Sequence, residues 1–148
     1  ATGAPAPTVH EVKHKRRAGA EGYNVISPQD DKRTDYTAIY DASGFSDGID
    51  EWIGRLTKGG ELTLAGFYSQ KLSFDFPRAF QREASLRIAA EWQPDDLIQT
   101  RALIDSGKLD LSCLISDQRP AEEAADAYPQ AFDDPDCLKM VLDWSSAA

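Results

Sequence analysis

One carboxylate near the start of the chain occupies a position typical of nucleotide binding. Glu11 ends the run Pro7-Thr8-Val9-His10-Glu11, whose residues favour β-structure. In dinucleotide-binding βαβ units, an acid closing the second strand accepts hydrogen bonds from the ribose hydroxyls of adenosine. Such an acid repels a 2′-phosphate, so Glu11 favours NAD over NADP. The alternative is an acid at a strand end that contacts no ligand.

Basic residues follow Glu11 directly: Lys13, Lys15, Arg16 and Arg17. Two interpretations are open. The first is a solvated loop leading into the first turn of a helix. The second is attraction of a cofactor phosphate, since enzymes that use NADP place Arg or Lys just beyond this strand. The choice between NAD and NADP therefore stays open at this point.

Small residues follow two later strands of the predicted sheet. Asp41-Ala42-Ser43-Gly44 ends one strand, and Ala65-Gly66-Phe67 ends the apolar run 62–67. Open α/β sheets bind ligands at the carboxyl ends of parallel strands, and small side chains let a flat cofactor approach the backbone. The alternative is that Gly44 and Gly66 only permit tight turns.

Structural roles are favoured for the other residues whose side chains could bind a metal or take part in catalysis. His10 and His14 are the only histidines, and they straddle a predicted strand end without a third ligand nearby, so no metal site is predicted. The spacing contains no readable Ser-His-Asp or Cys-His arrangement. The pairs Asp95-Asp96 and Glu122-Glu123 suit the positive N-terminal end of a helix.

Composition narrows the class of protein. A chain of 148 residues suits one domain with a sizeable core, and the net charge of -9 argues against nucleic acid as a general partner. No apolar run approaches the roughly 20 residues of a membrane span, and no signal peptide is visible. Cys113 and Cys137 form no C-x-x-C, so we expect reduced thiols in the cytoplasm, with a disulfide as the alternative.

Short apolar strands alternate with polar or amphipathic stretches, which is typical of an α/β fold with a mostly parallel sheet. The predicted strands are residues 8–12, 23–26, 37–41, 62–67, 86–92 and 137–144, with an extended segment at 111–115. The predicted helices are residues 15–20, 47–56, 94–106 and 120–132, with one helical turn at 79–83. In the second helix, Ile49, Trp52, Ile53 and Leu56 recur at helical spacing and should face the sheet.

These elements predict a truncated, Rossmann-like, doubly wound α/β domain over residues 1–144, with a disordered tail at 145–148. If Glu11 closes the second strand, the first strand and its G-x-G-x-x-G loop belong about 20 residues earlier. Ten residues precede Glu11, with one glycine, Gly3. We therefore expect the sheet to lack its first strand and the Gly-rich loop, whose backbone N–H groups hold a pyrophosphate.

The acidic strand end and four strings together resemble the C-terminal half of a medium-chain dehydrogenase/reductase. The strings are Tyr-Asp-Ala-Ser-Gly at 40–44 and residues 59–67, 119–128 and 137–144. Residues 16–23, 64–67, 72–80 and 86–94 are similar, more narrowly, to one branch of that superfamily. This branch uses NAD to oxidise the 3-(1-hydroxyethyl) group of a bacteriochlorophyllide to 3-acetyl in bacteriochlorophyll biosynthesis. The resemblance spans nearly the whole chain.

The resemblance implies site roles for particular residues. Glu11 would bind the ribose, residues 42–44 would line the track between adenosine and nicotinamide, and residues 65–67 would flank the nicotinamide. Lys139 matches a basic position that the superfamily often uses on the pyrophosphate. The cofactor-binding residues implied are thus Glu11, Ala42, Ser43, Gly44, Ala65, Gly66, Phe67 and Lys139.

A tetrapyrrole substrate requires a wide apolar shelf. The loop after the nicotinamide strand offers candidates to wall it, namely Tyr68, Leu72, Phe74, Phe76 and Phe80. The alternative for these side chains is a cap packed over the sheet. No catalytic residue is assigned within the chain, because the catalytic acid and any zinc ligand would lie mostly in the family's N-terminal catalytic domain.

The resemblance also implies partners and rivals. Strand 86–92 corresponds to the sheet edge through which relatives commonly form homodimers. Without the Gly-rich loop, the isolated chain is expected to bind NAD weakly or not at all and to have no turnover. The rival predictions are an S-adenosylmethionine-dependent methyltransferase domain and a non-catalytic interaction module that retains the dinucleotide fold.

Overall fold

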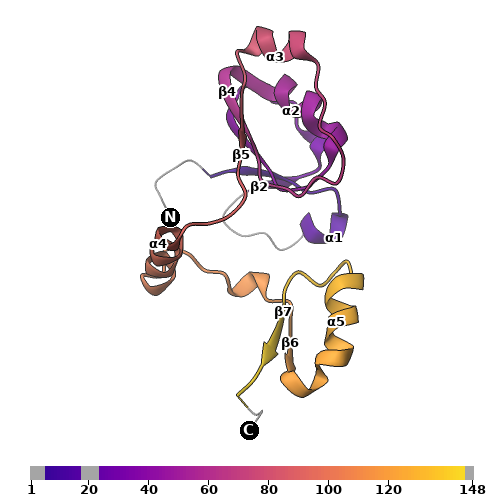
Figure 1. Cartoon of the computed structure of the whole chain (residues 1–148), viewed down its shortest axis with the longest axis vertical. Coiled ribbons are helices and arrows are strands. Elements are labelled where there is room, and N and C mark those ends of the chain that lie inside the picture. The colour runs from indigo at the N-terminus through magenta and orange to yellow at the C-terminus, as the bar shows by residue number, and fades with distance from the viewer. Residues whose placement is uncertain (1–5, 18–23, 146–148) are drawn as a thin grey trace. The chain divides into compact units, whose positions relative to one another are not determined.

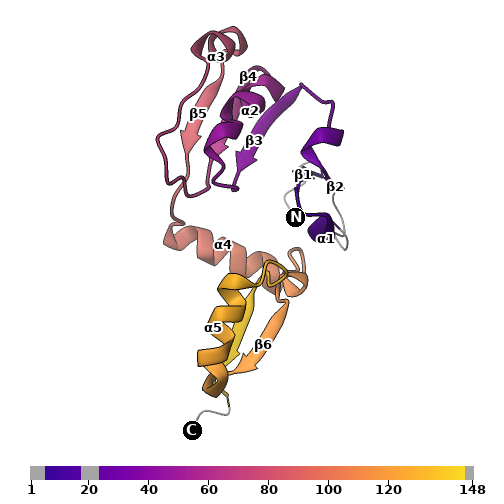
Figure 2. The same ribbon diagram turned by 90° about the vertical axis from the view of Figure 1, so that its right-hand side faces the viewer.

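The structure is a computed structural model that describes residues 6–17 and 24–145 (Figures 1 and 2). It divides into two compact units, which we treat separately. The three-stranded unit is Gln29–Trp92, and the terminal unit is Ala1–Pro28 together with Gln93–Ala148. The predicted end of the first helix, residue Tyr23 and nearly all of the predicted disordered tail lie outside the described residues.

The three-stranded unit alternates strands and helices. Its elements are β3 (Tyr36–Asp41), α2 (Ile49–Arg55), β4 (Leu56–Leu64), α3 (Phe76–Arg82) and β5 (Ser85–Ile88). The strands are parallel in the order β3-β4-β5, and each crossover carries one helix (Figure 2). Helix α3 lies at the amino ends of the strands, where the Arg82 guanidinium donates to the carbonyl of Leu56 at the start of β4.

The core of this unit lies between α2 and the middle strand. Ile49 and Ile53 on α2 are fully buried, as are Leu62 and Thr63 on β4. Neighbouring residues of β4 point to opposite faces, so burial of both shows that this strand is covered on each side. Trp52 packs against the same cluster. The predicted orientation of the helix toward the sheet is confirmed, since helical spacing places these side chains on one face.

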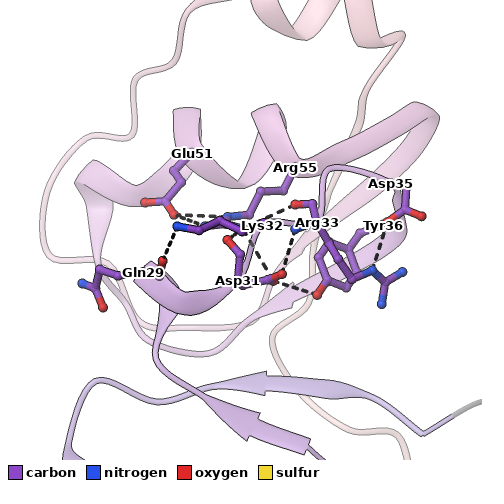
Figure 3. Close-up of polar contacts among 8 residues, drawn as sticks. All are labelled: Gln29, Asp31, Lys32, Arg33, Asp35, Tyr36, Glu51 and Arg55. Atoms are coloured by element: carbon purple, nitrogen blue, oxygen red, sulfur yellow. Dashed lines mark hydrogen bonds and ion pairs between the residues drawn. The ribbon is translucent and has the colours of Figure 1, made fainter.

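The polar loop before β3 is tied to α2 by a buried carboxylate (Figure 3). Asp31, whose side chain is 3% exposed, lies 3.5 Å from the Arg55 guanidinium. Its carboxylate also accepts hydrogen bonds from the backbone N–H of Arg33 at 2.9 Å and the hydroxyl of Tyr36 at 2.8 Å. Arg55 in turn donates to the carboxylate of Glu51 one turn earlier on α2. These contacts fix the amino edge of the sheet.

The terminal unit contains two parallel strand pairs. The first is β1 (Thr8–His10) with β2 (Asn24–Ile26), and α1 (His14–Arg17) follows β1. The second is β6 (Asp117–Pro120) with β7 (Met140–Asp143), and α5 (Ala124–Asp133) packs against both strands. Helix α4 (Pro94–Asp105) begins at a capping box between Gln93 and Asp96 and ends before Gly107, whose φ is +68°.

The α/β fold with parallel pairing is confirmed, although the described strands form three separate sheets rather than one. The pairing of β1 with β2 matches positions 2 and 3 of the Rossmann order 3-2-1-4-5-6, and β3-β4-β5 matches positions 4, 5 and 6. Position 1 has no counterpart among the described strands.

Four local predictions were wrong or incomplete. Leu56, predicted as the end of the helix 47–56, is the first residue of β4, which therefore starts before the predicted strand 62–67. Strand β6 was missed because Asp117–Pro120 is polar and carries no strand pattern. Residues 112–114 form a 3₁₀ turn instead of an extended segment, because the Asp110 carboxylate accepts a hydrogen bond from Ser112 N–H at 2.9 Å. Helix α3 runs for seven residues where one turn was expected. Pro129 lies inside α5 without ending it.

Candidate functional site

Two turns meet at the carboxyl edge of the three-stranded sheet. The β3 turn (residues 42–44) and the β4 turn (residues 65–67) are joined by a hydrogen bond of 2.7 Å from Ala65 N–H to the carbonyl of Asp41. A Cβ atom on Gly66 would lie 2.5 Å from the backbone nitrogen of Gly44. One on Gly44 would lie 2.5 Å from the carbonyl oxygen of Phe67. The two predicted segments are therefore in backbone contact.

A buried carboxylate holds the β3 turn. Asp41, at the end of β3, is 6% exposed. One carboxylate oxygen accepts hydrogen bonds from Ser43, from its N–H at 3.1 Å and from its hydroxyl at 2.7 Å. The Ser43 hydroxyl accepts in turn from Phe45 N–H at 3.1 Å. This chain of contacts gives the turn its shape without leaving the buried charge unpaired.

The second oxygen of Asp41 accepts a hydrogen bond from the hydroxyl of Tyr68, just beyond the β4 turn. Burial, followed by this contact with Asp41, raises the pKa of the Tyr68 phenol. Tyr68 is therefore a protonated donor throughout the physiological pH range. Its ring packs against the core beside Leu72. Tyr68 and Leu72, predicted to wall a substrate, are thus half-buried against the core.

The surface formed by the two turns is mostly backbone and small side chains. Phe67 projects from it and is 93% exposed. Gly44 has a φ of +70°, a conformation that glycine adopts without strain. The close approach of the turns leaves no room for larger side chains at Gly44 or Gly66.

The remaining predicted aromatic residues lie at the opposite edge of the sheet. Phe74, Phe76 and Phe80 line a groove of about 510 Å³ together with Leu86 at the start of β5. Lys58 and Glu83, also on its wall, form an ion pair of 2.9 Å. Because α3 lies at the amino ends of the strands, the structure does not bring Phe74 or Phe76 to the β4 turn. The prediction that Tyr68, Phe74 and Phe76 bind the substrate stays a prediction.

Glu11 belongs to the terminal unit, directly after β1. Its N–H donates to the carbonyl of Ile26 at 3.0 Å, which extends the pairing of β1 with β2. Its carboxylate accepts a hydrogen bond of 2.8 Å from the backbone N–H of Lys13. The acid is thereby held at the carboxyl end of β1. This is where the sequence pattern placed it.

The basic cluster after Glu11 is bound to its own chain. Lys15 forms an ion pair of 2.7 Å with Asp136, and Arg16 donates to the carbonyl of Pro135. Arg17 donates to the carbonyls of Glu11 and Val12. These contacts join α1 to the loop before β7. They favour a structural role for Lys15, Arg16 and Arg17 over attraction of a phosphate.

Lys139 lies in the terminal unit at the start of β7. Its carbonyl accepts hydrogen bonds from the N–H groups of Ser116 and Asp117, both at 3.2 Å. Its side chain lines a groove of about 660 Å³ whose other walls include Ile104 and Val141. The prediction that Lys139 binds a pyrophosphate stays a prediction.

Among the described residues, no group of three or more His, Cys, Asp and Glu side chains is arranged to hold a metal ion. No helix in residues 6–17 and 24–145 is long and apolar enough to cross a membrane. Cys113 and Cys137 are free thiols.

No protein-family model matches the chain. All 148 residues align at 58% identity with 2-desacetyl-2-hydroxyethyl bacteriochlorophyllide A dehydrogenase of Cereibacter sphaeroides, covering 46% of that protein. The protein of the same name from Rhodobacter capsulatus is 59% identical over 147 residues, which cover 47% of its length. The chain thus spans slightly less than half of these relatives. The resemblance found in the sequence is confirmed along the whole chain.

Solved structures show the same fold. L-idonate 5-dehydrogenase from Escherichia coli matches with a TM-score of 0.82 at 17% identity, over 93% of this chain and 42% of that one. An alcohol dehydrogenase from E. coli in complex with NADH matches with a TM-score of 0.77 at 18% identity, over 91% and 43% of the two chains. The chain therefore has the same Rossmann-like α/β fold as the matched parts of these structures.

Proposed function

We propose that this chain is the NAD-binding part of a dehydrogenase that converts the 3-(1-hydroxyethyl) group of bacteriochlorophyllide a to 3-acetyl in bacteriochlorophyll biosynthesis. The observation that carries the proposal is the 58% identity, over all 148 residues, to a protein named for that reaction. The relatives and structural neighbours described above are dehydrogenases, which favours this function over a methyltransferase or a non-catalytic module.

The two turns and Glu11 would each bind a different part of the cofactor. Glu11 would accept hydrogen bonds from the adenosine ribose, and the β3 turn (Ala42, Ser43, Gly44) would line the path of the dinucleotide. The β4 turn (Ala65, Gly66, Phe67) would flank the nicotinamide, and Lys139 would contact the pyrophosphate. Gly44 and Gly66 let the two turns meet backbone to backbone, because a Cβ at either position would clash with the other turn.

In the proposed reaction, bound NAD supplies the hydride acceptor. The residues of this chain contribute orientation: they hold the cofactor against the sheet edge and exclude water from the face that packs on the turns. The 148 residues contain no G-x-G-x-x-G loop. We therefore propose that the donors for the pyrophosphate and the catalytic groups come from another part of the whole protein, and that this chain by itself has no turnover.

Partners and location follow from the same proposal. The substrate would be a bacteriochlorophyllide, and a second copy of the protein would pair along β5, an edge strand with all four residues exposed. Unpaired strand edges favour such pairing. The free thiols of Cys113 and Cys137 suit a reducing compartment, so we place the protein in the cytoplasm.

The function is tested by hydride transfer. We expect the whole protein to form NADH when it is given NAD and 3-(1-hydroxyethyl) bacteriochlorophyllide a, as followed by nicotinamide absorbance and by the tetrapyrrole spectrum. The 148-residue chain alone serves as the comparison and should form none. Whole protein that binds S-adenosylmethionine but neither NAD nor NADH would contradict the proposal.

The role of Glu11 makes a separate prediction about cofactor choice. Glu11→Gln keeps an oxygen for the Lys13 N–H but removes the charge. We expect the Kd for NADH to rise about tenfold, because hydrogen bonds to charged groups are stronger than neutral ones. Binding of NADPH should improve relative to NADH, because repulsion of the 2′-phosphate is lost.

Titration of intrinsic fluorescence with each nucleotide measures both constants in the whole protein. Glu122→Gln, an equivalent change at an exposed position before α5, is the matched control and should alter neither. Unchanged preference between NADH and NADPH in Glu11→Gln would remove Glu11 from the proposed site.

A further inference from the structure

The three-stranded unit contains two tyrosine–aspartate hydrogen bonds, one at each edge of the sheet. At the amino edge, Tyr36 donates to Asp31 at 2.8 Å. At the carboxyl edge, Tyr68 donates to Asp41. Both aspartates are 6% exposed, and both tyrosines are half-buried. The two pairs are chemically alike but connect different segments of the chain.

The Tyr36–Asp31 pair holds a loop against the Arg55 side chain of α2 (Figure 3). The Tyr68–Asp41 pair, in contrast, joins the segments that carry the two turns. Asp41 precedes the β3 turn and Tyr68 follows the β4 turn. The turns themselves touch at Gly44 and Gly66 through backbone atoms alone. The hydroxyl of Tyr68 is thus a side-chain link across this backbone contact.

The same aspartate also sets the β3 turn through Ser43, whose N–H and hydroxyl both donate to it. Asp41 uses one oxygen for Ser43 and the other for Tyr68, so it connects the shape of the β3 turn to the position of the segment after the β4 turn. Burial, followed by the contact with Asp41, raises the pKa of the Tyr68 phenol, which favours the protonated donor. A shift of one turn against the other would break this connection.

We infer that Tyr68 is a positioning residue for the dinucleotide: its hydrogen bond to Asp41 holds the β4 turn against the β3 turn at the spacing that the nicotinamide half of the cofactor requires. The inference rests on the proposed function and deepens it. Tyr68 makes no contact with the cofactor in this role. It acts through the backbone of Ala65, Gly66 and Phe67.

The test is Tyr68→Phe in the whole protein, which keeps the ring in the core and removes the donor. We expect the Kd for NADH to rise about tenfold, because a buried hydrogen bond to a charged group is lost at the turns. The KM for NAD should rise by a similar factor, with a smaller change in kcat. Fluorescence titration and steady-state kinetics measure these constants, and thermal unfolding measures stability.

Tyr36→Phe is the matched control, because it removes the same kind of bond from the same sheet at the other edge. Both variants should unfold at a lower temperature than the wild type, but Tyr36→Phe should bind NADH as the wild type does. Equal NADH affinity in wild type and Tyr68→Phe, or equal weakening in both variants, would overturn the inference. In either case the proposed function would stand.

Wild-type protein that fails to bind NADH would overturn the proposed function and the inference with it. If Tyr68→Phe does not fold, Asp41→Asn provides the same test from the other partner. Its amide oxygen can still accept from Ser43, while its NH₂ group can only donate to the Tyr68 hydroxyl, so this bond is reversed and loses its charged acceptor. We expect weaker NADH binding in this variant too, and unchanged binding would overturn the inference.

Discussion

Gly66→Ala is expected to weaken NADH binding at least about a hundredfold, because a small clash at a positioned contact carries a large energetic cost. The added Cβ would lie 2.5 Å from the backbone nitrogen and 2.9 Å from the Cα of Gly44. Backbone atoms cannot rotate away as the end of a side chain can. The β3 and β4 turns must therefore separate, and the surface proposed to receive the nicotinamide changes shape.

The same substitution should also lower stability by about 1–3 kcal/mol, the usual range for overpacking. Titration with NADH gives the affinity, and urea unfolding gives the stability. Gly54→Ala is the matched control: on α2, its Cβ would meet only the mobile end of Arg78, at 3.4 Å. Alanine in a helix is favoured over glycine by about 0.5–1 kcal/mol, so this variant should be neutral or slightly stabilised.

A Gly66→Ala protein with wild-type NADH affinity would place the cofactor elsewhere on the molecule. Lost affinity with unchanged stability would show that the turns separate freely and that only the bound state needs their contact.

Asp31→Ala is expected to cost about 3 kcal/mol of unfolding free energy, because breaking a buried ion pair leaves the partner charge uncompensated. Asp31 is 3% exposed and Arg55 13% exposed at their side chains. The substitution removes the acceptor for Arg33 N–H and for the Tyr36 hydroxyl as well (Figure 3). Arg55 keeps its contacts with Glu51 and with the carbonyl of residue 31, which limits the loss.

Urea unfolding, with the midpoint and slope compared between variants, measures this loss. Asp35→Ala is the matched control, because the ion pair between Arg33 and Asp35 is solvent-exposed and such pairs contribute little. NADH affinity of folded Asp31→Ala should equal that of the wild type, since the network lies at the edge opposite the turns. A loss of stability no larger than that of Asp35→Ala would show that the buried network does not hold the loop.

Local sequence patterns predicted the elements that have a strong period. Ile49 and Ile53 recur at helical spacing, and the structure buries both on α2, whereas Leu56, predicted on the same helix, is buried as the first residue of β4. The apolar run of β4 predicted a strand covered on both faces, and its middle position in the sheet explains why. The small residues after β3 and β4 predicted turns at one edge, because parallel strands end together. These features depend on residues that are close in the sequence, so they can be predicted from it.

The sequence could not predict features that depend on pairing with distant residues. Strand β6 has no strand pattern of its own and forms by hydrogen bonding to β7, more than twenty positions later. Tyr68 appeared in the sequence as one aromatic residue of a loop with Phe74 and Phe76. The structure turns its hydroxyl to Asp41, 27 positions earlier, and carries the other two rings to the amino edge.

From the sequence alone, then, came the α/β class, the acidic end of the first strand, the two small-residue turns and the resemblance to dehydrogenases. Each rests on local spacing or on strings of residues that need no knowledge of contacts. The tertiary structure decided that the turns touch through Gly44 and Gly66, that Asp41 links them to Tyr68, and that the basic residues after Glu11 bind their own chain. Those outcomes depend on which groups, distant in sequence, form hydrogen bonds with each buried polar atom. Only the folded chain determines these hydrogen-bond partners.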